Sequence, residues 1–236
     1  MNASAFVRAL AAVQLEDVFN PYADTCGLFD RADAASTRRS NLRSYLRSVE
    51  GQGADTLWMG RDLGYRGGRR TGLALTDEYH LAEVPSLYAG TVVARATNGN
   101  AVAERTAAEI WAALRLVRGR PLLWNVFPLH PHEHGSELTN RRFSSRELEE
   151  VDGLNADLIS WLRIRRIVCI GQDAERYAKR YCDAVTVVRH PSYGGTSDFR
   201  RGIAEAYGVP RREVAPEDRQ RTMFDPGLAP KTRKSA

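Results

Sequence analysis

Four short apolar runs recur along the chain, and longer stretches with helical spacing of apolar residues lie between them. The runs are TLWMG (56–60), PLLWNVF (121–127), RRIVCIG (165–171) and AVTVVRH (184–190). Short apolar runs are typical of buried strands, and strands that alternate with helices pair in parallel. The pattern therefore predicts an α/β fold, a three-layer α/β/α sandwich with a central four-stranded parallel sheet. Ligands of such sheets bind beyond the carboxyl ends of the strands.

Helical periodicity of apolar residues predicts the helices around this sheet. The first, over residues 3–19, ends at Asn20-Pro21 because proline cannot continue a helix. The second runs from 34 to 49 and ends before Gly51. We expect a single α/β domain over residues 1–208, with residues 1–50 as an N-terminal helical extension. The remaining helices are predicted at about 101–117, 145–162, 172–181 and 198–207.

The C-terminal segment, residues 209–236, differs from the rest of the chain. It is rich in Pro, Arg and Glu and has no apolar periodicity. Such a composition cannot bury enough apolar surface to fold. We expect a basic, mobile tail, and its positive charge adds non-specific affinity for nucleic acid.

Composition excludes several classes of protein. The 236 residues are 43% hydrophobic and 27% charged, ordinary values for a globular protein. No apolar stretch reaches the roughly 18 residues that span a membrane. The N-terminal segment contains Glu16 and Asp17 and does not have the form of an export signal, so we expect a cytoplasmic protein. We also expect a monomer that does not contact membranes. Cys26, Cys169 and Cys182 lie too far apart in the sequence for a disulfide scaffold or an iron–sulfur cluster built within this chain.

The positive charge is carried almost entirely by arginine. The net charge is +5, and only three of the 34 basic residues are lysines. Guanidinium groups match phosphate oxygens two at a time, which suits contact with nucleic acid. The segment 38–70 alone holds eight arginines against three acidic residues. A GC-rich genome, which favours arginine codons, explains the composition equally well.

Three polar side chains stand where predicted strands end. Asp62 lies in a glycine-rich turn, residues 60–72, that matches neither a mononucleotide P-loop nor a dinucleotide fingerprint. Asn125 lies within an apolar run, where an unpaired amide costs about 1–3 kcal/mol and a pyrimidine edge would pair it. His190 follows the last run, where a neutral imidazole can donate to an oxygen that becomes negative. Taken singly, each residue also fits a purely structural role, such as a turn cap or a hydrogen bond to loop backbone.

Together these segments resemble motifs of the uracil-DNA glycosylase superfamily. GRDLGY (60–65) is similar to the GQDPYH motif of the family-one enzymes, and GLALT (72–76) to their GLxFS motif. Asn125 stands at the position of their strand-end asparagine, and HPSYGG (190–195) is similar to HPSPLS. The resemblance covers about residues 54–195, and four motifs in the same order are more specific than any one of them.

The chain also departs from the family-one motifs. Leu63 replaces a proline, and Gly64 replaces the tyrosine that excludes the thymine methyl group, so rejection of thymine depends on Tyr65. The glycine-ended turn is closer to the GEAPG of the iron–sulfur family-four enzymes or the GINPG of the mismatch-specific ones. The cluster cysteines of family four are missing, so the resemblance implies no metal and no other cofactor. Gly194 replaces the wedge leucine, which leaves Tyr193 to fill the emptied base stack.

The resemblance implies a DNA repair enzyme that flips uracil out of DNA and hydrolyses its N-glycosidic bond. Asp62 would stabilise the sugar cation and position the attacking water, and His190 would stabilise the departing uracil anion. Asn125 would read the O4 and N3–H edge, and Leu75 would cover the face of the ring. The lysines lie outside every motif, so we expect a monofunctional enzyme that leaves an abasic site.

These assignments define three sets of residues. The catalytic residues are Asp62 and His190. The residues expected to bind uracil are Gly60, Arg61, Leu63, Gly64, Tyr65, Leu75 and Asn125. The residues expected to contact DNA are Arg66, Arg69, Arg70, Arg189, Ser192 and Tyr193.

Two patterns in the sequence imitate functional motifs. His130, His132 and His134 alternate, and imidazoles suit zinc, but the intervening prolines favour a loop that faces DNA. GQD (171–173) looks like the family-one motif without its Pro-Tyr, so we expect Asp173 to cap a helix.

Two other functions are compatible with the sequence. A metal-dependent phosphoesterase or nuclease would use Asp62 and His190 together with His130 and His132. A catalytically inactive DNA-binding module would keep the fold without the chemistry. A chelator separates the first from a glycosylase, and substitution of Asp62 separates the second.

Overall fold

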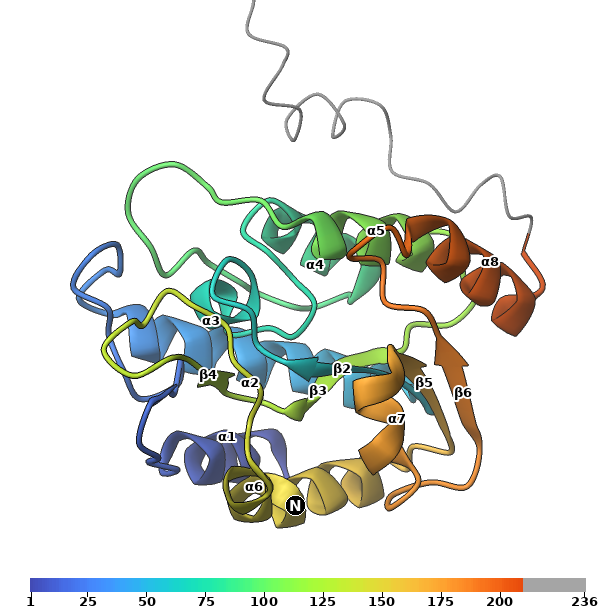
Figure 1. Ribbon diagram of the computed structural model, residues 1–236, viewed down its shortest axis with the longest axis horizontal. Coiled ribbons are helices and arrows are strands. Elements are labelled where there is room, and N and C mark those ends of the chain that lie inside the picture. Colours follow the sequence, from blue (N-terminus) through green and yellow to red (C-terminus); the bar gives the residue numbers. More distant parts are fainter. Residues whose placement is uncertain (210–236) are drawn as a thin grey trace, which may run out of the picture.

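The computed structural model describes residues 1–209 and confirms the predicted fold class, a parallel sheet between two layers of helices (Figure 1). The strand order is β3-β2-β5-β6, with every pair parallel. Each strand coincides with one of the four apolar runs. The predicted tail, except for Val209, lies outside the described residues. The strands are β2 (Thr56–Asp62), β3 (Leu122–Phe127), β5 (Arg166–Ile170) and β6 (Val185–Val188).

The strand order determines which helices cover which face. Parallel crossovers are right-handed, so connections that run in opposite directions along the sheet lie on opposite faces. α6 (Ser145–Trp161) and α7 (Gln172–Ala178) connect β3 to β5 and β5 to β6, and both lie on one face (Figure 1). α5 (Arg105–Leu114) lies on the other face with α8 (Thr196–Tyr207). Three short helices precede α5: α3 (Gly68–Thr71), η1 (His80–Glu83) and α4 (Val84–Leu87).

The first helix is shorter than its periodicity predicts. α1 spans Ala3–Ala11, not residues 3–19. The Asn20 side chain folds back and donates hydrogen bonds of 2.9 Å to the carbonyl oxygens of Leu10 and Val13. Leu10 lies in the last turn of α1 and Val13 just after it, so the Asn20 side chain satisfies carbonyl acceptors that a longer helix would have used.

The residues after α1 form a small second sheet that the sequence did not predict. β1 (Val18–Phe19) pairs antiparallel with β4 (His130–Pro131). The segment around His130 was expected to be a loop because of its prolines. Pro131 lies in this strand opposite Val18, and a proline is tolerated in a short edge strand because its missing N–H need not face a partner.

The N-terminal residues share the hydrophobic core of the sheet. Phe6 of α1 and Leu46 of α2 (Ala34–Gln52) are fully buried in the same cluster as the strands. The Tyr45 hydroxyl accepts a 2.7 Å hydrogen bond from the backbone N–H of Leu123, so α2 covers the open edge of β3. Residues 1–50 are therefore packed as part of the domain that forms the sheet.

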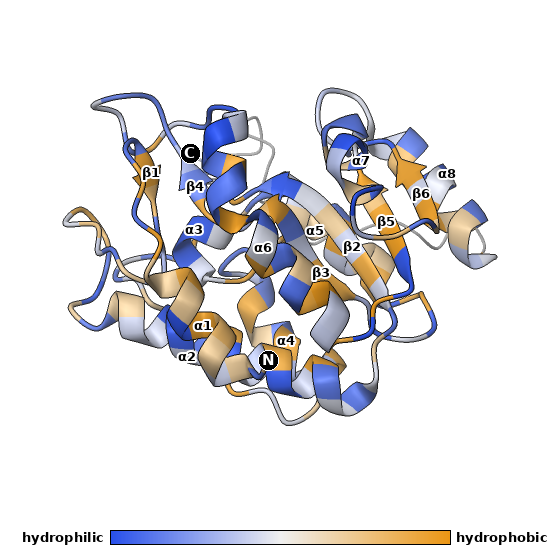
Figure 2. Ribbon diagram, turned by 90° about the horizontal axis from the view of Figure 1, so that it is seen from below, coloured by the Kyte–Doolittle hydropathy of each residue, from blue (hydrophilic) through white to orange (hydrophobic). Residues whose placement is uncertain are grey.

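Hydrophobic residues concentrate in the strands, most visibly in β3, β5 and β6, whereas the outer faces of the helices are mixed or polar (Figure 2). Within residues 1–209, no helix is both long enough and apolar enough to cross a membrane.

Candidate active site

Asp62 is the last residue of β2, and its side chain is only 8% exposed. The neighbouring Arg61 donates from Nε to Asp62 Oδ2 at 2.5 Å. Burial raises the pKa of the Asp62 carboxyl, and the positive charge of Arg61 opposes that rise. The strand end thus holds a carboxylate that is largely desolvated and has one charged partner beside it.

Asn125 lies on β3 directly opposite Gly60 of β2. Its side chain is 1% exposed, and neither its Nδ2 nor its Oδ1 has a hydrogen-bond partner among the described residues. A buried amide left unpaired costs about 1–3 kcal/mol. A ligand edge that offers one donor and one acceptor would remove that cost.

Because Gly60 has no side chain, the side chains of Asn125 and Leu75 can pack against its backbone. A Cβ atom on Gly60 would overlap Asn125 Oδ1 and would lie 3.0 Å from Leu75 Cδ2. Leu75 itself has a φ of 55°, a left-handed conformation that is unfavourable for a leucine. Strained backbone conformations of this kind cluster at active sites and ligand-binding sites. The structure thus brings together Gly60, Leu75 and Asn125, three of the residues expected to bind uracil.

His190 follows β6, and its ring is fixed by Ser192. The Ser192 backbone N–H donates to His190 Nδ1 at 3.2 Å, and Ser192 Oγ lies 2.8 Å from the same nitrogen. Burial, followed by the charges of Arg61 and Arg189, lowers the pKa of His190 to about 4. The imidazole is therefore neutral at physiological pH, with Nδ1 as acceptor and the proton on Nε2. It is a hydrogen-bond donor without a charge.

Gly171 after β5 lets the His190 segment approach the sheet closely. A Cβ atom on Gly171 would lie 3.2 Å from the Cβ of His190, and the φ of Gly171 is 95°. Both the space and the backbone conformation favour glycine there. The neighbouring strand end thus determines where the imidazole lies.

The strand order places these groups along one edge of the sheet. Asp62 is the last residue of β2, Asn125 lies two residues before the end of the adjacent strand β3, and His190 follows β6 at the other side of β5. Arg61 interacts with both ionisable groups of the site: it forms an ion pair with Asp62, and its positive charge lowers the pKa of His190. The expected carboxylate, amide and imidazole therefore all lie at the carboxyl edge.

Several residues expected to contact DNA are exposed. Tyr193 is 96% exposed and has a φ of 50°, so a strained turn presents the whole ring to solvent. The side chains of Arg66 and Arg189 are also exposed. Ser192 contacts His190 in this structure. The roles of these residues toward DNA stay predictions.

The structure contradicts the DNA contacts expected of Arg69 and Arg70. The Arg69 side chain is fully buried, with its guanidinium carbon 3.9 Å from the centre of the Phe19 ring. Arg70 is nearly buried and pairs with Glu78 at 2.9 Å. α3 turns both side chains inward, where aromatic rings and a carboxylate surround them. They stabilise the turn and are not available to phosphates.

Two residues of the glycine-rich turn also differ from expectation. The Leu63 side chain is buried, and a Cβ atom on Gly68 would overlap its Cδ2, so it packs inside the turn and does not reach a base. Tyr65 is half-buried, and its backbone N–H donates to Asn140 Oδ1 at 3.2 Å. The expected contact of Tyr65 with uracil stays a prediction.

The alternating histidines do not form a common site. His130 is buried with Nδ1 2.7 Å from the Leu63 carbonyl oxygen, and burial lowers its pKa to about 4. His134 is 85% exposed and lies 3.0 Å from Asp17. Within the described residues, the group with ligand atoms close enough to share an ion is Glu16, Asp17 and His134, which does not include His130. His130 is thus a structural residue beneath the turn, and not part of a loop that faces DNA.

Two acidic residues near the site were not assigned to it from the sequence. Asp173 was expected to cap a helix, but Gly171 is the N-cap of α7 and Asp173 makes no capping hydrogen bond. Its carboxylate lies 3.5 Å from Arg61 and 3.3 Å from Arg142. The position of GQD directly after a strand was the signal that pointed to it.

The second such residue is Glu104, at the start of α5. Cβ atoms on Gly64 and Gly67 would contact or overlap its carboxyl oxygens, so these glycines admit it against the turn. Burial, and then the negative charge of Asp77, raises the pKa of Glu104 to about 7. Nothing in the sequence around Glu104 indicated this position.

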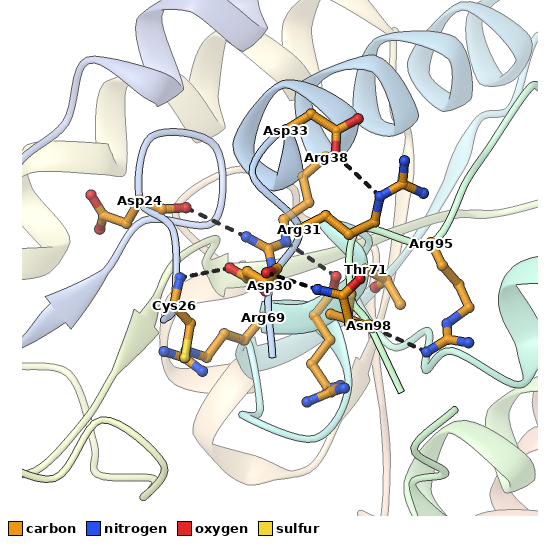
Figure 3. Close-up of polar contacts among 12 residues, drawn as sticks. Asp24, Cys26, Asp30, Arg31, Asp33, Arg38, Arg69, Thr71, Arg95 and Asn98 are labelled. Atoms are coloured by element: carbon orange, nitrogen blue, oxygen red, sulfur yellow. Dashed lines mark hydrogen bonds and ion pairs between the residues drawn. The ribbon is translucent and has the colours of Figure 1, made fainter. Parts of the chain in front are cut away.

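Residues from the N-terminal half of the domain pack against the glycine-rich turn (Figure 3). Arg38 of α2 is fully buried, pairs with Asp30 and donates from Nε to the Arg70 carbonyl oxygen at 3.1 Å. Asn41 donates to the carbonyl oxygen of Thr71 at 3.0 Å, in the same turn. The position of the turn that follows Asp62 therefore depends on α2 and the loop before it.

Comparison with solved structures finds a protein of similar fold. A solved structure that shows this is wild-type SMUG2 of Pedobacter heparinus, with a TM-score of 0.62 and 14% sequence identity over 88% of this chain and 96% of that chain. No protein-family model and no curated protein matches the sequence.

Proposed function

We propose that this protein is a DNA glycosylase that removes uracil from DNA and leaves an abasic site. The observation that carries the proposal is the buried Asn125 amide, whose donor and acceptor are both unpaired beside Gly60. The O4 and N3–H edge of uracil supplies one acceptor and one donor, and cytosine offers the reverse pattern at this edge. The likeness in fold to SMUG2 supports the proposal.

Asp62 and His190 stabilise charges of opposite sign that develop as the glycosidic bond breaks. The sugar gains oxocarbenium character as the bond breaks, and an ionised Asp62 stabilises that positive charge. His190 donates from Nε2 to uracil O2, where negative charge develops. Such a single donor is worth about 3–4 kcal/mol in the transition state. Because His190 is already neutral, no proton has to leave it before the reaction.

DNA binding and base extrusion use the exposed residues around the edge. Rotating a nucleotide out of the duplex costs a few kcal/mol, which phosphate contacts of Arg66 and Arg189 offset without reading sequence. Tyr193, exposed on its strained turn, fills the emptied stack. Lys179, the lysine within the described residues, lies at the end of α7 and not at the site, so no amine is placed for a Schiff-base reaction.

The test is incubation of the purified protein, in EDTA, with an oligonucleotide that contains one uracil, followed by alkali. We expect strand breakage at the uracil only after alkali, because alkali cleaves where a base has been removed. Matched oligonucleotides with cytosine or thymine at the same position are the controls, and the cytosine strand is expected to stay intact.

Two other results would replace the proposal. Breakage before alkali that disappears in EDTA would indicate a metal-dependent nuclease. Binding to the oligonucleotide with no base release under any condition would indicate a DNA-binding module without this chemistry.

A further inference from the structure

Four charged side chains of alternating sign extend from the candidate active site toward the surface. Asp62 pairs with Arg61 at 2.5 Å, Arg61 lies 3.5 Å from Asp173, and Asp173 lies 3.3 Å from Arg142. Exposure increases outward, from the nearly buried Asp62 to Arg142, which is 68% exposed. We call these residues the charged row. Its members come from β2, from the first turn of α7 and from the segment before α6.

Arg61 is shared between two carboxylates. Its Nε and Nη2 face the two oxygens of Asp62, while Nη1 faces Asp173. Arg61 opposes the rise in the pKa of Asp62 that burial causes, and the negative charge of Asp173 adds to that rise. Arg141 also lowers the pKa of Asp62, and the Glu104 carboxyl interacts with Asp62 as a like charge. The charge state of Asp62 therefore depends on how strongly the Arg61 guanidinium pairs with Asp62 and how strongly it pairs with Asp173.

We propose that Asp173 is a positioning residue that draws part of the Arg61 guanidinium away from Asp62, so that the Asp62 carboxylate stays available to the sugar cation. This inference rests on the proposed glycosylase function. An arginine that pairs with one carboxylate alone forms a strong two-point contact and neutralises it. Asp173 is one-third exposed, so its own hold on Arg61 is weaker and can be exchanged.

The positive charge of Arg61 is also needed to keep Asp62 ionised. A carboxylate as buried as Asp62 takes up a proton when no positive charge is near. A protonated Asp62 has no charge to offer the sugar. The arrangement therefore needs Arg61 close enough to keep Asp62 ionised and Asp173 close enough to keep Arg61 from neutralising it.

The test is Asp173→Asn, compared with the wild type in single-turnover release of uracil across a pH series. We expect the plateau rate to fall about tenfold, a coupling of ordinary size between contacting residues, with DNA affinity unchanged. The acid limb should move to lower pH, because the negative charge that raises the pKa of Asp62 has gone. Asp198→Asn, which removes an exposed carboxylate paired with Arg201 on α8, is the control and should match the wild type.

A double variant separates positioning from a structural effect. Arg61→Gln alone should move the acid limb to higher pH, since Asp62 loses the charge that holds its pKa down. Adding Asp173→Asn to Arg61→Gln should cause no further loss of rate, because no guanidinium is left to position. Additive losses, or an Asp173→Asn variant with a lower melting temperature and the wild-type pH profile, would overturn the inference. If the wild type releases no uracil, the proposed function fails; if it does and Asp173→Asn behaves like the wild type, only this inference fails.

Discussion

Replacing Asp62 by asparagine is expected to lower the rate of uracil release by about 10²- to 10³-fold, the size of effect seen when one preorganised electrostatic contact is removed. The substitution keeps the shape of the side chain and removes its charge. Asp62 is nearly buried at the end of β2, so it contributes little to contacts with phosphates. We therefore expect DNA affinity to stay within about twofold of the wild type.

The measurement is single-turnover release of uracil together with an equilibrium binding assay at fixed salt concentration, because affinity for DNA depends steeply on salt. Asp55→Asn is a matched control, since Asp55 stands just before β2 at its opposite end and pairs with Arg165. An Asp62→Asn variant with wild-type rates would show that the carboxylate has no part in the chemistry. The wild-type rate should also fall as pH drops through the raised pKa of Asp62, because only the ionised form stabilises a cation.

Replacing His190 by alanine is expected to lower the rate of uracil release by about 10²-fold or more. The physical reason is the loss of the Nε2–H donor, which the contact between Nδ1 and Ser192 keeps in place. DNA affinity should change much less than the rate. His190→Gln keeps an N–H donor in the same region and should recover part of the loss.

His134→Ala is the control for His190→Ala. His134 is exposed beside Asp17, and its removal should leave the rate of uracil release unchanged. Equal losses of rate and affinity in His190→Ala would contradict the assigned role and point to a residue that merely holds the DNA-binding loop. A rate that rises below about pH 4, where His190 becomes charged, would also contradict donation by a neutral imidazole.

The four strands were predicted correctly because each is a short apolar run bounded by loop or helix signals. β3 is buried along its whole length, whereas β6 at the sheet edge leaves Val187 39% exposed. The first helix was predicted too long, because its true end depends on the Asn20 side chain. The pairing of β1 with β4 is likewise a contact between segments more than 100 residues apart. Local periodicity carries no information about either.

The sequence likewise predicted part of the candidate site and missed another part. Positions near strand ends follow from the pattern of apolar runs, so the amino-acid sequence alone places Asp62 and His190 at the carboxyl edge of the sheet and Asn125 in the last half of its strand. The direction of a side chain in a turn does not follow from that pattern. Arg69 and Arg70 looked like surface arginines, yet aromatic rings and Glu78 draw them inward.

The most direct test of the account is a crystal structure of the protein soaked with free uracil. We expect the ring beside Gly60, with its O4 and N3–H paired to the Asn125 amide and its O2 within hydrogen-bond distance of His190 Nε2. Asp62 should lie on the side of N1, where the sugar would be attached. A uracil ring bound elsewhere, or a strand-end edge that stays empty at saturating uracil while Asn125 keeps its present position, would contradict the account.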